Sequence, residues 1–586
     1  MNRVITPSKT PMKTKNNVLY DIDLVFSFFI FLFGLIVFTA WLTPEFINFQ
    51  TRFALFAQQM WHTGISFFPK TYQGNYADYP AASTIIIYLI SLLWGRVTVL
   101  TTVLPTAIVS SCILVVIYHI GLIRSRAWGL CAVLLALLTQ AFLEASRNIS
   151  PDQYISLITA LCFYLAYSAT VFNRTRRLLF IPLLLIIGFA FRGPIGLVIP
   201  TGVLCSYYAY NREFKKLFIV ALIAGFLLMI GGALLLLAAY HQGGMDFVNQ
   251  VINMQVLRRM HGHATKAIHF YYYWIYSLGN YAISYFLALI VIIANLKNII
   301  KNKNADHKLL GCLTVWLLVI LVGMSLPADK KIRYILSIVP ATSLIAAYLL
   351  VNLSKTGILF WARKLLMHFF RLLPLLLFVI TVLALILSQH YKINLNVYGF
   401  VTLVLIFVLC IVCPSFPRRR ESSAFSMRTR TKFALDTAIM TSLKLCLTSK
   451  SQYDEAGKCL RLTFIATLAF IIFNIGIVEP VSYSFEKTKP LVHKVENLLN
   501  QHPGRLVFYR VGPDGEDIKF MANMNRLIKP YFIQSPQAIL NYQHSAYFIT
   551  KQSEYTQLPK PIAQHIQLLL KGTIGHQQCV VFKRRG

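Results

Sequence analysis

Charged side chains that could do chemistry stand directly beside long apolar runs, where a charge is costly and is usually kept for function. In chain order they form five groups: Glu45, Arg52 and Asp78, with the neutral Tyr79 beside them; Arg147 and Asp152; Arg192; Arg258 and Arg259; and Lys330, Lys331 and Arg333. Cations outnumber carboxylates in this set. Lysine and arginine bind phosphate through charge-assisted hydrogen bonds, so the set predicts a site for a phosphate-bearing substrate.

Transfer of a sugar from a phosphate-linked lipid would use these residue types in two ways. Cations near the departing phosphate stabilise the negative charge that develops on it. The candidates for this role are Lys330, Lys331, Arg333, Arg192, Arg52 and Arg147. A carboxylate near the sugar deprotonates the acceptor hydroxyl or stabilises positive charge at the anomeric carbon. The candidate catalytic residues are Asp152, Asp78 and Glu45, and the candidates for a substrate loop are Arg258, Arg259 and Tyr79.

Each group also has a structural interpretation. Asp152 follows Pro151 and suits the N-terminus of a helix, a role that is compatible with catalysis. The cluster Lys330–Arg333 could contact lipid headgroups from a helix end, and Arg192 could anchor such an end. Arg258 and Arg259 could be ordinary loop charges.

The elements that would position these residues are membrane helices. The chain of 586 residues is 56% apolar and only 13% charged, with a mean hydropathy of +0.60, whereas soluble proteins carry about 25% charged residues. Repeated apolar runs separated by short basic loops predict many transmembrane helices. The formal charge of +35 comes mostly from those loops, where lysine and arginine set topology, so nucleic-acid binding is not expected.

The basic loops also predict the orientation of the chain. The basic N-terminus stays inside, and a first span at about 23–43 leads outside. The short apolar piece Ala81–Trp94 either spans the membrane or lies at its outer interface, and only the second interpretation keeps the later basic loops inside. We adopt that interpretation, which places all five charged groups on the outer side. About thirteen spans are then expected, at about 23–43, 99–122, 127–143, 153–172, 178–191, 194–210, 217–240, 270–296, 309–326, 334–353, 372–388, 395–413 and 459–478.

The expected fold class is a polytopic α-helical membrane protein with a small C-terminal α/β domain outside the cytoplasm. The expected regions are a cytoplasmic tail at 1–22, a transmembrane domain at 23–478 with its first outer loop and interfacial helices at 44–98, and a soluble domain at 479–586. The basic stretch 414–458 is interpreted as a disordered cytoplasmic insertion, with a lipid-headgroup patch as the alternative. In the C-terminal domain, strands are expected at Arg505–Val511, Ala546–Thr550 and Gln578–Phe582, and helices at Glu516–Met524 and Gln564–Leu570.

Several segments resemble, in their order along the chain, the GT-C glycosyltransferases, in particular the bacterial lipid A aminoarabinose transferases and the protein O-mannosyltransferase-like family. These segments are Thr51-Arg-Phe-Ala-Leu-Phe-Ala-Gln-Gln-Met60, Tyr76-Ala-Asp-Tyr-Pro-Ala-Ala82, Ser150-Pro-Asp-Gln153, Phe189-Ala-Phe-Arg-Gly-Pro-Ile-Gly196 and Lys330-Lys-Ile-Arg-Tyr-Ile-Leu336. The resemblance covers nearly the whole chain. It implies transfer of a glycosyl group from a polyprenyl-phosphate-linked sugar to a lipid A-like glycolipid or a protein, with Arg192 in the position of a family lysine.

The chain departs from the family pattern at two places. The family's Asp-Glu pair would fall near Phe49 and Gln50, neither of which is acidic, and Glu45 is the nearest carboxylate. The basic residue of the second motif falls on Tyr79. A divergent enzyme would therefore use Asp78 or Asp152. The alternatives are a degenerate relative that binds carrier lipid without chemistry, and a lipid-linked-sugar flippase, which the lack of an internal repeat disfavours.

No cofactor and no metal ion are expected, because carboxylates are sparse and the pair His261 and His263 does not complete a ligand set. The expected partners are a polyprenyl-phosphate sugar donor, a glycolipid or protein acceptor, and membrane lipids, with the chain acting as a monomer. The expected location is the bacterial inner membrane, with the active site and the C-terminal domain facing the periplasm.

Overall fold

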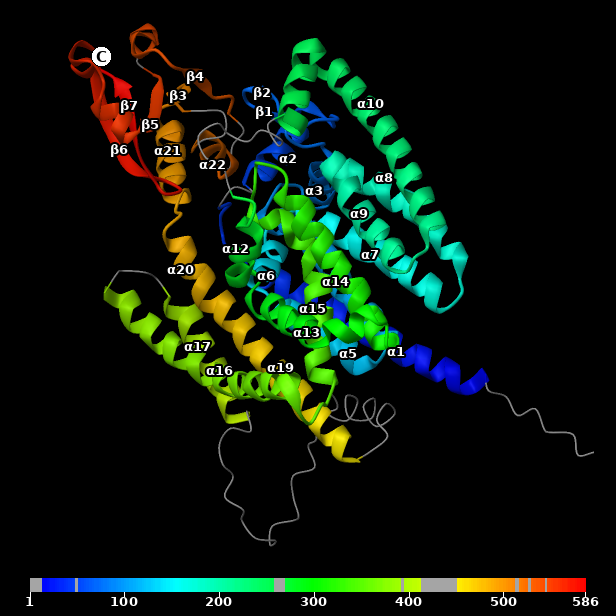
Figure 1. Ribbon diagram of the computed structural model, residues 1–586. Coiled ribbons are helices and arrows are strands. Elements are labelled where there is room, and N and C mark those ends of the chain that lie inside the picture. The colour runs from blue at the N-terminus through cyan, green and yellow to red at the C-terminus, as the bar shows by residue number, and fades with distance from the viewer. Residues whose placement is uncertain are drawn as a thin grey trace, which may run out of the picture.

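The computed structural model describes residues 13–47, 51–257, 269–390, 395–412, 450–511, 516–524, 528–542 and 545–585. It consists of a helical bundle with a small mixed sheet beyond one end, which we call the sheet end (Figure 1). The expected fold class, a polytopic helical membrane protein with a small C-terminal α/β region, is confirmed.

Within the described residues, nine helices are long and apolar enough to cross a membrane, or ten if the bent pair α5 (Arg126–Leu137) and α6 (Gln140–Ser146) is one span. The nine are Ile22–Thr39 of α1 (Lys13–Thr39), α4 (Val99–Leu122), α7 (Pro151–Val171), α10 (Phe214–Ile252) extended to Gln255, α13 (Ala282–Ile300), α14 (Ala305–Ser325), η3 with α15 (Ile332–Val351), α16 (Gly357–His390), and the run Glu455–Ser484, which joins α19 (Lys450–Phe473) to α20 (Glu479–Ser484). Shorter helices complete the bundle: α3 (Ala82–Trp94), α8 (Ile181–Arg192), α9 (Pro194–Tyr210), α12 (Tyr272–Asn280) and α17 (Asn396–Val412). The expected count of about thirteen spans therefore stays a prediction.

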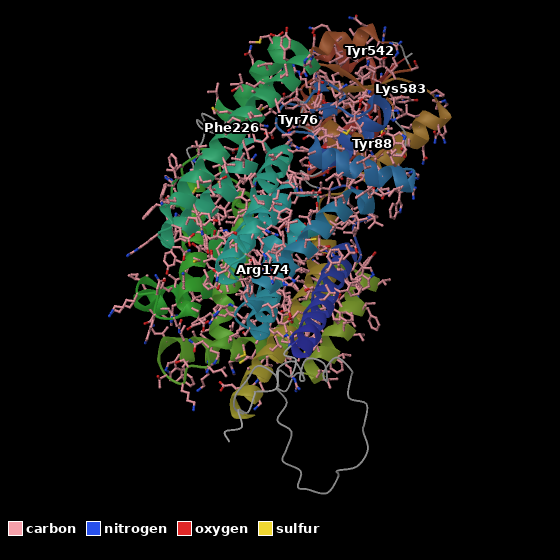
Figure 2. All side chains as sticks on the ribbon, turned by 90° about the vertical axis from the view of Figure 1, so that its right-hand side faces the viewer. Tyr76, Tyr88, Arg174, Phe226, Tyr542 and Lys583 are labelled. Carbon is pink, nitrogen blue, oxygen red and sulfur yellow. The ribbon has the colours of Figure 1, made fainter. Side chains whose placement is uncertain are left out.

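The outward faces of the bundle are apolar, as a lipid environment requires. On α10, Phe218 is 67% exposed, Phe226 56% and Met229 69%, and Figure 2 shows Phe226 on the outer side of the molecule. Exposure of so continuous an apolar surface to water would cost free energy, whereas contact with the hydrocarbon chains of lipids costs little. The chain is a multi-pass membrane protein.

The span expected at 127–143 is not one straight helix, because the chain bends by 76° between α5 and α6, and whether this pair crosses the membrane stays a prediction. At the bend, the Thr139 N–H bonds to the Ala136 carbonyl at 3.1 Å, and the Thr139 hydroxyl donates to the Leu135 carbonyl at 3.0 Å. The hydroxyl thus satisfies a carbonyl near the end of α5. After α6, residues 147–150 lead directly into α7, and the Gln153 amide donates to the Ser146 hydroxyl at 2.9 Å across the junction.

Helices α8 and α9 form a tight hairpin that depends on glycine. Gly193 joins them with φ +62° and ψ −146°, a conformation that side chains with a Cβ rarely adopt. A Cβ on Gly188 would lie 2.3 Å from the Gly196 carbonyl oxygen, so the two backbones are in contact. The hairpin fixes the last residue of α8, Arg192, at the sheet end.

The first loop, residues 40–81, contains α2 (Thr51–Thr63) and a small hairpin of β1 (Lys70–Thr71) and β2 (Gly74–Asn75). The Gln242 amide of α10 both donates to the Phe68 carbonyl and accepts from the Phe68 N–H, at 2.9 Å each. Directly after Gln242, α10 kinks at Gly243 and Gly244, where Gly244 has φ +68°. One side of the first loop is therefore attached to the end of α10.

The sheet has the strand order β4-β3-β5-β7-β6, with bounds Tyr531–Ile533, Leu506–Tyr509, Tyr547–Lys551, Gln577–Arg584 and Ile566–Ile574. Strand β3 is parallel to β4 and β5, and β7 is antiparallel to β5 and β6. The three expected strands and the helix α22 (Glu516–Ala522) are present. The helix expected at Gln564–Leu570 is wrong, since these residues mostly form β6, whose backbone groups pair with β7 across a turn at Gly575 with φ +60°.

The C-terminal unit, which runs from α21 (Lys489–Gln501) to β7, packs against the first loop (Figure 1). The Asn523 amide donates to the Phe46 carbonyl at 2.9 Å and accepts from the Phe46 N–H at 2.8 Å. The Gln58 amide donates to the Ala522 carbonyl at 3.0 Å. Leu55 of α2 lies in the apolar core of the C-terminal unit, so the first loop has a second attachment there.

Candidate functional site

Three charged side chains from separate elements meet at the sheet end. Asp152, at the second position of α7, accepts a hydrogen bond from Arg192 Nε at 2.9 Å, and its other oxygen lies 3.5 Å from Arg333 Nε. Arg192 is only 2% exposed. Asp152 thus bridges two guanidinium groups. It lies in the first turn of α7, after the N-cap residue Ser150, and its carboxylate faces the arginines.

Aromatic rings flank these charges. The Arg192 guanidinium lies 4.6 Å from the ring centroid of Tyr79 and 5.5 Å from that of Tyr334. Tyr79 stacks on Tyr76 with ring centroids 6.3 Å apart, and the Tyr76 hydroxyl accepts a hydrogen bond from Arg52. Cation–π contacts favour a buried guanidinium without neutralising it, so they help to hold Arg192 while leaving its charge for a ligand.

The segment Lys330–Arg333 is held by tyrosines whose role the sequence did not reveal. The Tyr273 hydroxyl donates to the Lys331 carbonyl and accepts from the Lys331 N–H, both at 3.2 Å, and the Tyr281 hydroxyl donates to the Ile332 carbonyl at 2.8 Å. Lys331 Nζ lies 3.9 Å from Asp329, and Lys330 is buried. These contacts fix the backbone of the cationic segment next to Arg192.

The remaining member of the site is Asp78, in the bend that precedes α3. Gln255, which follows α10, donates to the Asp78 carbonyl, and so places the end of α10 over the first loop. Asp78 lies within electrostatic reach of Arg192 and Lys331. Gln255 is a site residue that sequence reasoning missed, because a glutamine near a helix end carries no distinguishing signal.

Two predicted residues lie outside this cluster. Glu45 is 2% exposed and accepts hydrogen bonds from the Tyr483 hydroxyl and from the backbone N–H groups of Thr488 (3.0 Å) and Lys489 (2.6 Å). These bonds involve both carboxylate oxygens and connect the first loop to the start of the C-terminal unit. The structure therefore does not bring Glu45 into the cluster around Arg192, and its catalytic role stays a prediction.

Arg147 also has a structural role. It pairs with Glu479 at 2.5 Å and donates to the carbonyls of Val37 and Ala40 at the end of α1. Its guanidinium therefore joins α1, α6 and α20, and its expected contact with a donor phosphate stays a prediction. The predicted substrate-loop residues Arg258 and Arg259 lie outside the described residues, as do Phe49 and Gln50.

The gathered residues form a small cavity lined by Phe53, Tyr79, Ile149, Ser150, Pro151, Asp152, Arg192 and Arg333. Near it, the cations Arg52, Lys330 and Lys331 give an excess of positive charge over Asp78, Asp152 and Asp329. Arg192 Nη1 is buried and has no hydrogen-bond partner among the described residues, so it is available to a ligand oxygen. The cationic lining of such a site suits an anionic group such as a phosphate. No group of three His, Cys, Asp or Glu side chains within the described ranges could hold a metal ion.

Comparison with known proteins finds one matching family model. The family model described as dolichyl-phosphate-mannose-protein mannosyltransferase matches residues 78–235, a segment that includes Asp78, Asp152 and Arg192. A search of the curated proteins by sequence finds no match.

Two solved structures of one protein share the fold. ArnT from Cupriavidus metallidurans bound to undecaprenyl phosphate is 11% identical with a TM-score of 0.62, and the match covers 96% of this chain and 98% of that one. ArnT in the apo state has the same identity and TM-score, with 97% and 98% covered. The resemblance to the GT-C glycosyltransferases is thereby confirmed at the level of the fold.

Proposed function

We propose that this protein transfers a glycosyl group from a polyprenyl-phosphate-linked sugar to a lipid or protein acceptor. The observation that supports this most is the buried carboxylate of Asp152 between Arg192 and Arg333. It lies in a fold similar to that of ArnT, a protein crystallised with undecaprenyl phosphate. A lipid-facing helical bundle with a cationic site at one end suits a substrate that has a long apolar chain and a phosphate head.

In the proposed reaction, Arg192, Arg333 and Lys331 bind the donor phosphate. The acceptor oxygen attacks the anomeric carbon, the bond from that carbon to the phosphate oxygen breaks, and the cations stabilise the negative charge left on the phosphate. Asp152 acts as a positioning residue, since both of its oxygens face guanidinium groups that it orients. Lys330 and Arg52 add positive charge around the same phosphate.

We further propose that the sheet end faces the periplasm from a bacterial inner membrane. The basic loops at Arg174–Arg177 and Lys297–Lys308 support this, because loops rich in lysine and arginine remain on the cytoplasmic side. Figure 2 places Arg174 well below Tyr76, Tyr542 and Lys583, which lie toward the sheet end. The donor and acceptor would then meet outside the cytoplasm.

The test is a transfer assay in proteoliposomes with radiolabelled undecaprenyl-phosphate sugars and a membrane extract as acceptor. Wild type is compared with Asp152→Asn, Lys330→Ala and the remote control Arg174→Ala. We expect label to move to an acceptor with wild type and Arg174→Ala, and far less with the two site variants. Equal transfer by all four proteins would exclude the proposed site. Binding of the carrier without transfer from any donor would favour a degenerate relative, and movement of the donor between leaflets without transfer would favour a flippase.

A further inference from the structure

A second cavity adjoins the Arg192 site. Residues 147–149 of the connection between α6 and α7 line this cavity, residues 149–152 line the first one, and Ile149 lines both. The second cavity lies between the ends of α1, α4, α6 and α20. Its charged lining residues are Glu45, Glu144, Arg147 and Glu479.

Three carboxylates line this cavity, and their bonding differs. Both oxygens of Glu45 accept hydrogen bonds, as described above, and Glu479 pairs with Arg147. Glu144 lines the cavity and is exposed as a residue, and its carboxylate forms no hydrogen bond or ion pair within the described part of the chain. Of the three, Glu144 is the one whose lone pairs can accept a proton from a molecule in the cavity.

The position of the cavity along the helices indicates which kind of molecule it binds. Val99, Thr102 and Val103 lie in the first turns of one candidate span, and Asn474 and Val478 lie ten and six residues before the end of another, the 30-residue run Glu455–Ser484. Leu42 follows the end of the first span by three residues. The cavity therefore lies at the level where spans end, which is the level of lipid headgroups. Its mixed apolar and hydrogen-bonding lining suits the hydroxylated head of an amphiphile more than an extended protein segment.

We propose that this cavity binds the hydroxylated headgroup of a lipid acceptor, and that Glu144 is the base that deprotonates it. This proposal rests on the proposed function. In the step, the acceptor O–H proton passes to the Glu144 carboxylate while the acceptor oxygen forms a bond to the anomeric carbon. The bond between that carbon and the phosphate oxygen breaks, and the polyprenyl phosphate leaves with the electron pair. The proton then passes from Glu144 to water.

The placement of Glu144 fits a role as the base while Asp152 orients the arginines. The Gln153–Ser146 hydrogen bond fixes the start of α7 against the end of α6, so the elements that carry Asp152 and Glu144 are held together. Tyr281 lies within electrostatic reach of both carboxylates. Asp152 is committed to two arginines, whereas Glu144 is not.

The experiment measures transfer by Glu144→Gln and Glu144→Asp in proteoliposomes, with separate lipid and protein acceptor fractions. We expect Glu144→Gln to lower kcat at least about 100-fold, the usual effect of losing a general base. Binding of undecaprenyl phosphate and the melting temperature should stay unchanged. We expect Glu144→Asp to restore part of kcat, and the rise of the wild-type rate with pH to disappear in Glu144→Gln. Label should appear in the lipid fraction.

The control is Glu554→Gln, which removes a carboxylate paired with Arg510 on the C-terminal unit and should keep the wild-type rate. If wild type transfers sugar and Glu144→Gln does so within twofold of it, Glu144 is not the base, although the proposed function stands. Label in the protein fraction alone would overturn the lipid acceptor. If wild type transfers to neither fraction, the proposed function itself fails.

Discussion

Arg192 illustrates how a single residue can define a site in a membrane protein. Its side chain is 2% exposed, yet it carries a full charge, with one carboxylate and two tyrosine rings as neighbours. A buried charge is tolerated only with such partners. Because Nη1 still has no bonding partner among the described residues, the arrangement is incomplete in a way that an anionic ligand would complete.

Replacement of Arg192 by alanine should weaken undecaprenyl phosphate binding by about tenfold or more, because a hydrogen bond to a charged group contributes roughly 1.5–3 kcal/mol. Arg192→Lys should restore little of the affinity, since an ammonium group cannot reproduce the planar contacts with Tyr79, Tyr334 and Asp152. Titration of purified protein with undecaprenyl phosphate measures both. Unchanged affinity in Arg192→Ala would place the phosphate elsewhere, and Arg174→Ala controls for the loss of any arginine.

A double-mutant cycle tests whether Asp152 acts through Arg192. Asp152→Asn alone should reduce phosphate affinity, because Arg192 loses the partner that orients it. In the Arg192→Ala background, the same change should have much less effect, with a coupling of about 1 kcal/mol or more for residues in direct contact. Additive effects, measured by the same titration, would show that Asp152 contributes independently of Arg192.

The sequence revealed the charged residues of the site because charge is rare beside apolar runs. Asp152, Arg192 and the segment Lys330–Arg333 were predicted on that ground and come together in the structure. Gln255 and Tyr273 could not be predicted, since polar and aromatic residues are common at helix ends and their partners are backbone groups far away in sequence. Glu45 and Arg147 are also charged residues beside apolar runs, but in the structure they join elements of the fold to one another.

At the scale of elements, the α8–α9 hairpin positions Arg192, and Gly193 is its weak point. Gly193→Ala should lower stability by about 1–3 kcal/mol, because its φ of +62° and ψ of −146° strain any residue with a Cβ. It should also weaken phosphate binding through displacement of Arg192. The matched control is Gly202→Ala in α9, where a Cβ would meet its nearest neighbour at an ordinary 3.7 Å. Thermal unfolding measures the loss of stability, and titration with undecaprenyl phosphate measures the loss of binding. Equal stability and affinity in the Gly193→Ala and Gly202→Ala variants would contradict the role of Gly193.

Elements dictated by the membrane were predictable, whereas elements dictated by tertiary contacts were not. A long apolar run must be helical in a bilayer, because its backbone groups have no water to bond. The bend between α5 and α6 depends on where Thr139 finds partners, which include Ser284 of α13. Strand β6 depends on pairing with β7, and its apolar residues Leu568–Leu570 fit a helical pattern equally well without that knowledge.

At the scale of the whole molecule, the first loop is fixed between α10 and the C-terminal unit. Gln242 and Gln255 hold one side, and Asn523, Gln58 and Glu45 connect the other. The loop carries Arg52, Tyr76, Asp78 and Tyr79 into the site. The C-terminal unit therefore contributes to the geometry of the site although none of the gathered charges belongs to it.

This attachment should depend on pH through Asp517, which accepts a hydrogen bond from Gln73 of the first loop at 3.3 Å. Burial raises the pKa of Asp517 from 3.8 to about 6. A raised carboxyl pKa favours the protonated folded form, so stability should decline as pH rises from about 4 to 6 and then stay level. Since each pKa unit corresponds to about 1.4 kcal/mol, the decline is on the order of 3 kcal/mol.

Asp517→Asn cannot ionise and should abolish this decline, so it should be more stable than wild type at pH 7. Thermal unfolding in detergent between pH 4 and 7 measures the effect. Glu554→Gln, which alters a partly exposed carboxylate of the same unit, should keep the wild-type pH dependence. A wild-type profile that is flat over this range would contradict the buried, protonated state of Asp517.

The contact between Phe46 and Asn523 joins residues 477 positions apart. Ribosomes add roughly 5–20 residues each second, so Asn523 is synthesised on the order of 20–100 s after Phe46. During that interval the helices can already enter the bilayer, while Arg52, Asp78 and Tyr79 lack one of their two supports. The helical bundle can therefore insert into the membrane before the C-terminal unit, which supports the first loop, has been synthesised.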